Sequence, residues 1–361
     1  MHSPRDMAAP ADPENTVRLA RLDGLRGIAA CVVAFAFHAR TMYADNLLGL
    51  DLRFPWISWP HVLGWTAVDL FFVLSGYIFA HVYLTRPVLT SKPALAEFGV
   101  ARFARLYPLH VTLVLVIAAV SLGKGANTLP NMVLNLAMLQ AFTNPVAQNF
   151  VGPSWSLTVE CLCYLLFALA AYDGRRTLMR LTVAAIVGGA AWFVLFGEAS
   201  GPWVIDIFPR GLLGFFLGQA LWHGRARLAE VRGWLLAAIF AAGMLLPTGS
   251  ASPLIPLCLL AWPAALLLAL RMPWLESRPM VWLGDRSYAI YLIHLPLIQA
   301  AGWAFGLLPP TPGLVVGGHL ALIAATLLLS DLALRFLEKP ARSAIRAAWA
   351  RRPLSFSRAL G

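Results

Sequence analysis

The chain has 361 residues, of which 59% are hydrophobic and only 12% are charged, and its formal net charge is +11. A soluble globular domain has about 25% charged residues, so this composition excludes an ordinary soluble protein. The basic excess does not indicate a nucleic-acid partner either. The lysines and arginines are spread over short segments between apolar runs, which is the pattern of membrane topology.

Ten apolar runs are long enough to cross a hydrocarbon core of about 30 Å. They do not alternate apolar and polar residues as the strands of a membrane barrel do. We therefore predict an all-α, polytopic integral membrane protein with about ten transmembrane helices and no soluble domain. The predicted spans lie at about 24–41, 62–84, 106–123, 153–172, 179–196, 203–222, 233–249, 254–271, 287–305 and 313–334.

The loops between the spans alternate in basic charge. One side carries only Arg40, Arg53 and Lys124, and apart from Arg210, inside a span, all other lysines and arginines fall on the opposite side. The positive-inside rule then places both termini in the cytoplasm. No cleavable signal peptide is expected, because the first 20 residues lack an apolar segment.

Three parts of the chain follow from this topology. We expect a cytoplasmic N-terminal arm at 1–20, a membrane domain at 21–342 and a basic cytoplasmic tail at 343–361. The tail interleaves basic and apolar residues, which predicts a short helix on anionic lipid. No CxxC motif occurs and no metal site is predicted.

The first span places Arg26 near the cytoplasmic face and His38 in the outer half, because twelve residues of helix rise about 18 Å. Ionisable groups in a membrane span usually face a bundle interior or a wet cavity. Histidine titrates near neutral pH, so His38 is a candidate general base. The alternative is that Arg26 extends to the interface and His38 caps the helix in interfacial water.

Several other ionisable residues fall at the outer ends of predicted spans. Asp69, Glu160, Asp206 and Arg210 lie at about the depth of His38. We predict that these side chains meet in one polar outer chamber, because each would be costly to leave unpaired in a bilayer. A carboxylate beside His38, above all Asp69, is expected to orient its ring.

Arg102 and Arg105 lie three residues apart at the cytoplasmic start of a span, so their guanidiniums share a helix face. Guanidinium groups bind phosphate oxygens in bidentate geometry. Ordinary positive-inside charge explains the same pair. For Ser75 and Gly76 we predict helix packing, and for His294 a hydrogen bond between helices.

Six motifs occur in a fixed order, and together they resemble the membrane acyltransferase-3 family. This family includes bacterial O-acetylases of lipopolysaccharide and exopolysaccharide and macrolide acyltransferases. The resemblance implies a ten-helix acyltransferase domain at 21–342 in a bacterial inner membrane. It also implies an acyl-CoA donor, acetyl-CoA in the simplest case, and a hydroxyl acceptor presented on the far side. The motifs are RLDGLRGIAA…FHA, FFVLSGY, RFARLYPLH, PSWSLTVE, SYAIYLIHLP and EKPAR.

The resemblance assigns the family's histidine to His38 and its arginine to Arg26. It assigns the two arginines that hold the donor's phosphates to Arg102 and Arg105, and the acidic residue to Glu160. The family usually has ten residues between the first arginine and the histidine, whereas this chain has eleven. Either a π-bulge absorbs the extra residue, or Arg26 and His38 do not share a face.

The predicted activity is acyl transfer from acyl-CoA, with no permanently bound cofactor, and the predicted donor-binding residues are Arg102 and Arg105, helped by Arg26. His38 acts as general base on a glycan or other hydroxyl, Asp69 or Glu160 fixes its tautomer, and Arg210 stabilises the oxyanion. A covalent acyl-histidine intermediate is equally consistent with these residues. Two other classes remain open at this point: a transporter or flippase of a glycan or lipid intermediate, and a scaffold subunit of an export complex.

Overall fold

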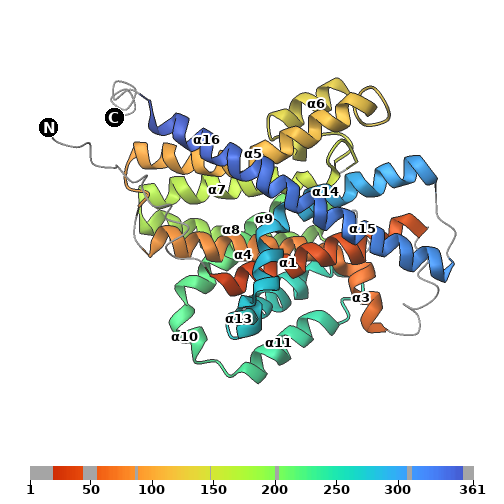
Figure 1. Ribbon diagram of the computed structural model, residues 1–361. Coiled ribbons are helices and arrows are strands. Elements are labelled where there is room, and N and C mark those ends of the chain that lie inside the picture. The colour runs from red at the N-terminus through yellow and green to blue at the C-terminus, as the bar shows by residue number, and fades with distance from the viewer. Residues whose placement is uncertain are drawn as a thin grey trace.

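The computed structural model describes residues 19–43, 55–85, 88–146, 148–199, 203–306 and 311–352, and every regular element in these ranges is helical (Figure 1). The predicted all-α class is confirmed. Most of the predicted arm at 1–20 lies outside these ranges. The α-helices are α1 Ala20–Cys31, α3 Pro55–Leu63, α4 Ala67–Leu84, α5 Lys92–Ser121, α6 Leu129–Leu136, α7 Trp155–Asp173, α8 Arg175–Phe196, α9 Ile207–His223, α10 Arg225–Ala229, α11 Gly233–Leu245, α12 Leu254–Pro256, α13 Trp262–Ala269, α14 Arg278–Phe305, α15 Pro312–Ala333 and α16 Lys339–Ala350.

Within the described ranges, seven helices are long and apolar enough to cross a membrane. The other three predicted spans correspond to α9, which has 17 residues, and to the shorter apolar helices Gly233–Leu245 and Leu254–Ala269. The count of ten crossing helices therefore stays a prediction. The seven are Ala20–Met42, Trp59–Leu84, Lys92–Ser121, Gly152–Asp173, Arg175–Phe196, Arg278–Phe305 and Pro312–Ala350.

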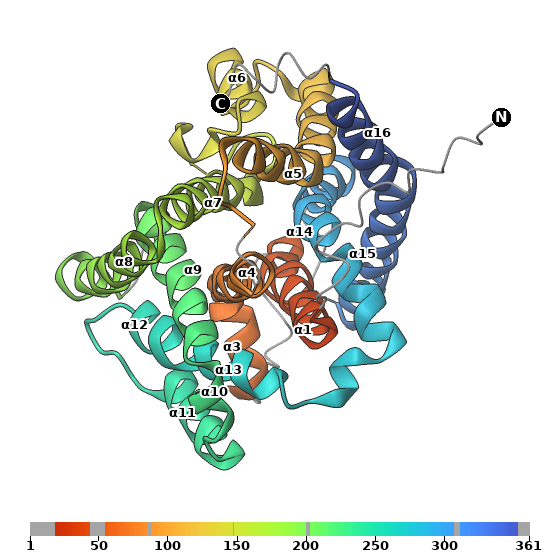
Figure 2. The same cartoon turned by 90° about the vertical axis from the view of Figure 1, so that its left-hand side faces the viewer.

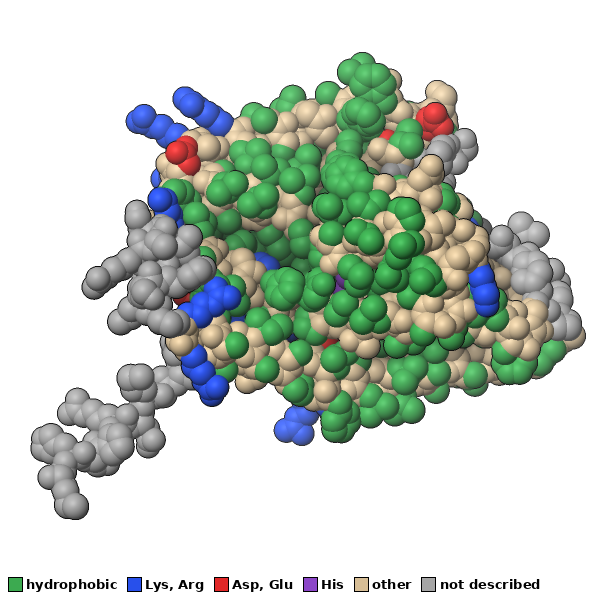
Figure 3. All heavy atoms as spheres, turned by 90° about the horizontal axis from the view of Figure 1, so that it is seen from above, with side chains coloured by type: hydrophobic (Ala, Val, Ile, Leu, Met, Phe, Trp, Pro, Cys, Tyr) green, Lys and Arg blue, Asp and Glu red, His purple; other side chains and the backbone are tan. Residues whose placement is uncertain are grey.

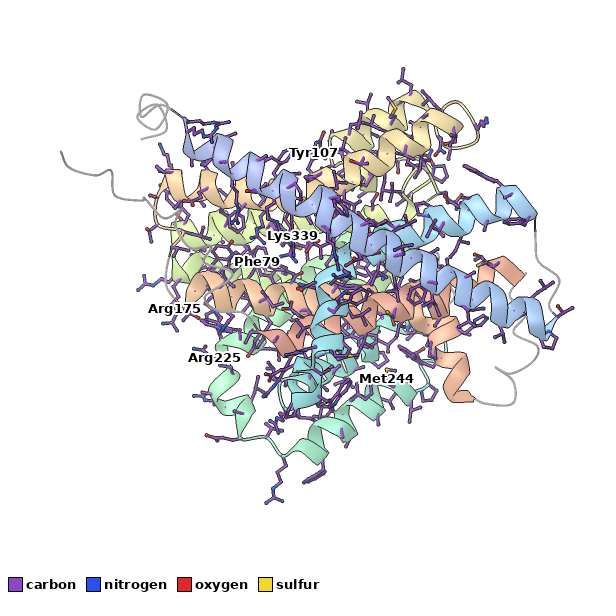
Figure 4. All side chains as sticks on the ribbon, viewed as in Figure 1. Phe79, Tyr107, Arg175, Arg225, Met244 and Lys339 are labelled. Carbon is purple, nitrogen blue, oxygen red and sulfur yellow. The ribbon has the colours of Figure 1, made fainter. Side chains whose placement is uncertain are left out.

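One face of the bundle is mostly apolar, and its basic side chains lie mainly at one end. In Figure 3 hydrophobic side chains cover most of the visible face, and lysines and arginines gather mainly at the left. Figure 4 labels Arg175 and Arg225 at this same end, which we call the basic end, and Met244 toward the opposite end. An apolar face with basic charge gathered mainly at one end is the arrangement expected of a bundle that crosses a bilayer.

Glycines let the central helices approach closely. A Cβ atom added to Gly76 of α4 would lie 1.7 Å from the backbone oxygen of Phe215 on α9, and one added to Gly218 would lie 2.0 Å from that of Val73. Between α1 and α14, a Cβ on Gly27 would lie 2.8 Å from the amide nitrogen of Gly284. Small residues at helix contacts allow this backbone proximity, and the packing role predicted for Gly76 is confirmed.

We expect the substitution Gly76→Ala to destabilise the protein. The new methyl group would overlap a backbone oxygen that no side-chain rotation can remove, and overpacking of this kind costs about 1–3 kcal/mol or more. Thermal unfolding in detergent should show a lower midpoint for Gly76→Ala than for Gly99→Ala, whose Cβ meets no atom within 4 Å. Equal midpoints for the two variants would contradict this packing.

The first membrane helix contains a π-helical segment. After α1 the chain forms a π-helix at Val32–Phe37 and then a 3₁₀ turn that starts at His38. A π-helical turn accommodates an extra residue. Of the two alternatives predicted for the eleven residues between Arg26 and His38, the π-bulge is therefore confirmed. As a result Arg26 and His38 both face α14: Arg26 Nε donates to Ser287 Oγ at 3.0 Å, and the ring of His38 contacts α14 further along.

The segment between α5 and α7 fixes the start of α7. It contains α6, and its buried amides bond to one another: Asn135 Nδ2 donates to Asn149 Oδ1 at 2.8 Å. Gln140 Nε2 donates to the carbonyl of Ser154 at 2.7 Å, immediately before α7. This polar network holds the motif that begins α7 in a fixed position relative to α5.

The C-terminal helix continues α15 without a break. A π-helical segment at Leu334–Glu338 joins α15 to α16, and α16 lies along α5 (Figures 1 and 2). The predicted tail helix is therefore present, but the predicted boundary at 342/343 falls inside it. Residues 353–361 lie outside the described ranges.

Candidate active site

A cavity lies between α1, α4, α5, α7 and α14, the helices grouped at the centre of Figure 2, which looks from the basic end. Its charged lining residues are Arg26, Arg102, Arg105 and Glu160. The structure thus brings together four of the residues predicted from the sequence. Three guanidiniums face one carboxylate, which makes the cavity suited to an anionic ligand. The other polar lining residues are Ser75, Tyr83, Ser156, Tyr164, Ser287, Tyr288 and Tyr291.

Arg102 is held in an aromatic cage. Its guanidinium carbon lies 5.1 Å from the ring centroid of Phe79, 5.9 Å from that of Phe98 and 6.0 Å from those of Tyr83 and Tyr164. Cation–π contacts of this kind stabilise a buried guanidinium, and the side chain is only 6% exposed. Figure 4 labels Phe79 within the bundle. The cage fixes the direction in which Arg102 meets the cavity.

Arg26 is held by α1 and α14. Its Nη2 donates to Asp23 Oδ1 at 2.9 Å, and its Nε bonds to Ser287. One of the three guanidiniums is therefore already neutralised by a carboxylate. Arg105, one helical turn from Arg102, lines the same cavity and is more exposed than Arg102. The two arginines of the RFARLYPLH segment thus both reach the cavity.

Glu160 faces these arginines instead of His38. Its Oε1 accepts hydrogen bonds from Ser75 Oγ at 3.0 Å and from the hydroxyl of Tyr164. The predicted outer chamber containing both Glu160 and His38 is wrong for the part of the chain that is described, because α7 turns Glu160 toward α4 and α5. Ser75 also does more than pack, since it binds the carboxylate.

Asp69 and Arg210 form a separate buried pair. Arg210 Nε donates to Asp69 Oδ1 at 2.8 Å and its Nη2 to Oδ2 at 3.0 Å, and the two side chains are 3% and 0% exposed, respectively. The guanidinium carbon lies 4.6 Å from the ring of Trp65 and 5.1 Å from that of Trp155. Close packing of α4 on α9 brings the pair together, so Asp69 bonds to Arg210 and not to His38. Catalytic roles for both residues stay predictions.

His38 lies beside a second histidine. His38 Nδ1 is 2.9 Å from Nε2 of His294, which is completely buried on α14. The helix–helix hydrogen bond predicted for His294 is confirmed, and its partner is the candidate base. The motif SYAIYLIHLP places His294 near mid-span, at a depth compatible with His38, but nothing in the sequence states that the two spans are neighbours.

Aromatic rings separate the histidine pair from the cavity. Tyr291 lines the cavity, and the centroid of its ring lies 6.2 Å from that of His294. The centroid of the Phe71 ring lies 5.6 Å from that of Tyr291. The Tyr291 hydroxyl donates to the carbonyl of Pro153 at 2.9 Å and accepts from Ser156 Oγ at 3.1 Å. His38 itself is not a lining residue of the cavity. Sequence reasoning missed Tyr291 and Ser156, whose only signal was their place in two of the motifs.

Comparison with known proteins agrees with the motif series. Residues 19–331 match the family described as an acyltransferase domain. The acyltransferase MdmB of Streptomyces mycarofaciens is 29% identical over 80% of this chain and 81% of its own length. The exopolysaccharide production protein ExoZ of Rhizobium meliloti is 29% identical over 76% of this chain and 90% of its own length.

A third relative is longer than this chain. The peptidoglycan O-acetyltransferase OatA of Listeria monocytogenes is 22% identical over 89% of this chain but only 55% of its own length, so the chain spans about half of that protein. No solved structure matches the chain. The family and the names of the relatives favour an enzyme over a transporter or a scaffold subunit. The chain belongs to the acyltransferase family, and it is an O-acetyltransferase-like enzyme with membrane helices.

Proposed function

We propose that this enzyme moves an acyl group, acetyl in the simplest case, from cytoplasmic acyl-CoA to a hydroxyl of a glycan or other cell-envelope or secreted acceptor. The observation that carries the proposal is a cavity lined by three arginines, one of whose other lining residues, Tyr291, is in ring contact with His294, the partner of His38. The basic end faces the cytoplasm under the positive-inside rule. Ten spans, cytoplasmic termini and a bacterial inner membrane complete the proposed topology.

The donor's phosphates would bind at the arginines. Acyl-CoA carries a diphosphate and a ribose phosphate, and guanidinium groups bind such oxygens in bidentate geometry. Arg26, Arg102 and Arg105 would together supply the positive charge that meets the phosphates. The apolar part of the cavity wall would hold the pantetheine arm, with the thioester directed toward Tyr291.

Tyr291 lines the cavity and its ring contacts that of His294, so this proposal requires the acyl end to pass the Tyr291 ring to reach His38. At His38 the acceptor hydroxyl would attack the thioester carbon while the imidazole takes its proton. Collapse of the tetrahedral intermediate breaks the carbon–sulfur bond, and the proton passes to the sulfur. An acyl-histidine intermediate reaches the same products in two steps.

A glycan acceptor is supported by the relatives. The names of two of them refer to peptidoglycan O-acetylation and to exopolysaccharide production. We extend this substrate class to the present chain as a proposal. Incubating membranes that contain the protein with radiolabelled acetyl-CoA and candidate glycans tests it: label should appear in a glycan as an ester that dilute base releases. Saturable glycan transport without consumption of acetyl-CoA would contradict it.

We expect Arg105→Ala to weaken binding of the donor. Loss of one charge-assisted hydrogen bond costs about 1.5–3 kcal/mol, which corresponds to a rise of about 10–100-fold in KM for acetyl-CoA. The turnover number at saturating donor should change much less. Arg176→Ala, an exposed arginine on α8, is the matched control and should leave KM unchanged. An unchanged KM in Arg105→Ala would contradict the phosphate site.

A further inference from the structure

The hydrogen bonds of His294 define its tautomer. Its Nδ1 lies 3.0 Å from the carbonyl oxygen of Ile290, one turn earlier on α14. A carbonyl oxygen only accepts, so Nδ1 must carry a hydrogen. In a neutral imidazole the other nitrogen, Nε2, then has a free lone pair and can only accept.

This assignment determines the tautomer of His38 as well. His38 Nδ1 lies 2.9 Å from the accepting Nε2 of His294, so His38 must donate from Nδ1. The reverse direction would require a doubly protonated His294. That cation would be completely buried, with no bond to any carboxylate of the described residues, which is costly. His38 is therefore left with its lone pair on Nε2.

We infer that His294 is a positioning residue that holds His38 in its Nδ1–H tautomer, so that Nε2 is the atom that takes the acceptor's proton. This inference rests on the proposed function. The hydrogen bond to His294 occupies His38 Nδ1, the carbonyl of Val33 is a further partner of the ring, and His38 is only half-buried. Among the described residues no side chain other than His294 is hydrogen-bonded to the ring, so Nε2 is the atom left for a substrate hydroxyl.

The same nitrogen, His38 Nε2, takes and releases the proton during the reaction. When the hydroxyl oxygen bonds to the thioester carbon, its proton moves to His38 Nε2, and the imidazolium keeps its Nδ1–H bond to His294. When the carbon–sulfur bond breaks, the proton leaves Nε2 for the sulfur and both rings are neutral again. His294 gains and loses no proton in this cycle.

A neutral partner replaces the carboxylate that often orients a catalytic histidine. Asp69, the carboxylate expected in this role, has both oxygens bonded to Arg210. The backbone carbonyl of Ile290 takes the role of second orienting group, because it fixes which nitrogen of His294 accepts. The chain Ile290–His294–His38 thus orients the base without placing a negative charge beside it.

Two substitutions separate this role from packing. His294→Leu removes the acceptor, and His294→Gln retains an amide oxygen at a similar reach. We expect His294→Leu to lower kcat by about 10–100-fold, as loss of an outer-shell orienting group does, with KM for acetyl-CoA within about twofold of wild type. His294→Gln should recover a substantial part of kcat. His319→Gln is the matched control, because His319 makes the same contact one turn back, to Val315 at 2.9 Å.

The tautomer itself can be measured. Nitrogen NMR of the full chain, labelled with ¹⁵N-histidine and held in lipid nanodiscs, should show His38 as the Nδ1–H tautomer, assigned by the signal lost in His38→Gln. In His294→Leu the same signal should shift toward a mixture of tautomers. An Nε2–H tautomer at His38, or wild-type kcat in a folded His294→Leu, would overturn the inference. Wild-type turnover in His38→Gln would instead remove the proposed role of His38, and the spectrum would still test the tautomer.

Discussion

Replacing His38 with alanine should lower acyl transfer by about 10²–10⁴-fold, the usual contribution of a general base. His38 combines an Nε2 left for the acceptor, a fixed partner at Nδ1 and, through His294, a connection to Tyr291 in the lining of the arginine-lined cavity. The measurement is the initial rate of label transfer from acetyl-CoA in membranes, divided by the amount of folded protein. A covalent route through the histidine predicts the same loss.

Comparing the effects of the substitution on kcat and on KM identifies the role of His38. Because His38 does not line the cavity, the KM for acetyl-CoA in His38→Ala should stay within about threefold of wild type. This is a small change in binding free energy, since a tenfold change corresponds to about 1.4 kcal/mol. Arg105→Ala should show the opposite pattern, with a raised KM and a nearly unchanged kcat. His319→Ala controls for the loss of an imidazole elsewhere in the bundle. Near-native turnover by folded His38→Ala would contradict general-base catalysis.

Much of the site could be predicted from the sequence, because the position of a residue within an apolar run predicts its depth in the membrane. The positions of Arg26 and His38 along their span follow from a rise of 1.5 Å per residue. The shared face of Arg102 and Arg105 follows from their spacing of three. The extra residue between Arg26 and His38 predicted two alternatives, and the π-helical segment Val32–Phe37 decides between them.

The neighbours of each span could not be predicted. Residues at equal depth can lie on opposite sides of a bundle, and only packing decides which of them meet. Close contact of glycines between α4 and α9 pairs Asp69 with Arg210. The same kind of contact between α1 and α14 brings His38 to His294. Depth alone predicts Glu160 beside His38, whereas the orientation of α7 turns it toward the arginines.

The buried pair of Asp69 and Arg210 gives the largest expected effect on stability. Arg210→Met leaves the carboxylate of Asp69 completely buried without its partner, and breaking a buried pair in this way costs about 3–5 kcal/mol. We expect a lower thermal midpoint in detergent and a low yield of folded protein. Arg286→Met is the matched control with a smaller loss, because Asp331 keeps its bond to Arg335 at 2.8 Å.

The double variant Asp69→Leu/Arg210→Met should recover most of that loss, since apolar replacement of a buried ion pair is often neutral or stabilising. A methionine can also keep contact with the rings of Trp65 and Trp155. Neither side chain of the pair lines the cavity or bonds to the two histidines. If the pair acts through packing alone, turnover per folded molecule should stay within about tenfold of wild type, a change of about 1.4 kcal/mol in the activation free energy. A stable double variant as inactive as His38→Ala would show that Arg210 acts on the reacting atoms, because packing alone would already have been restored.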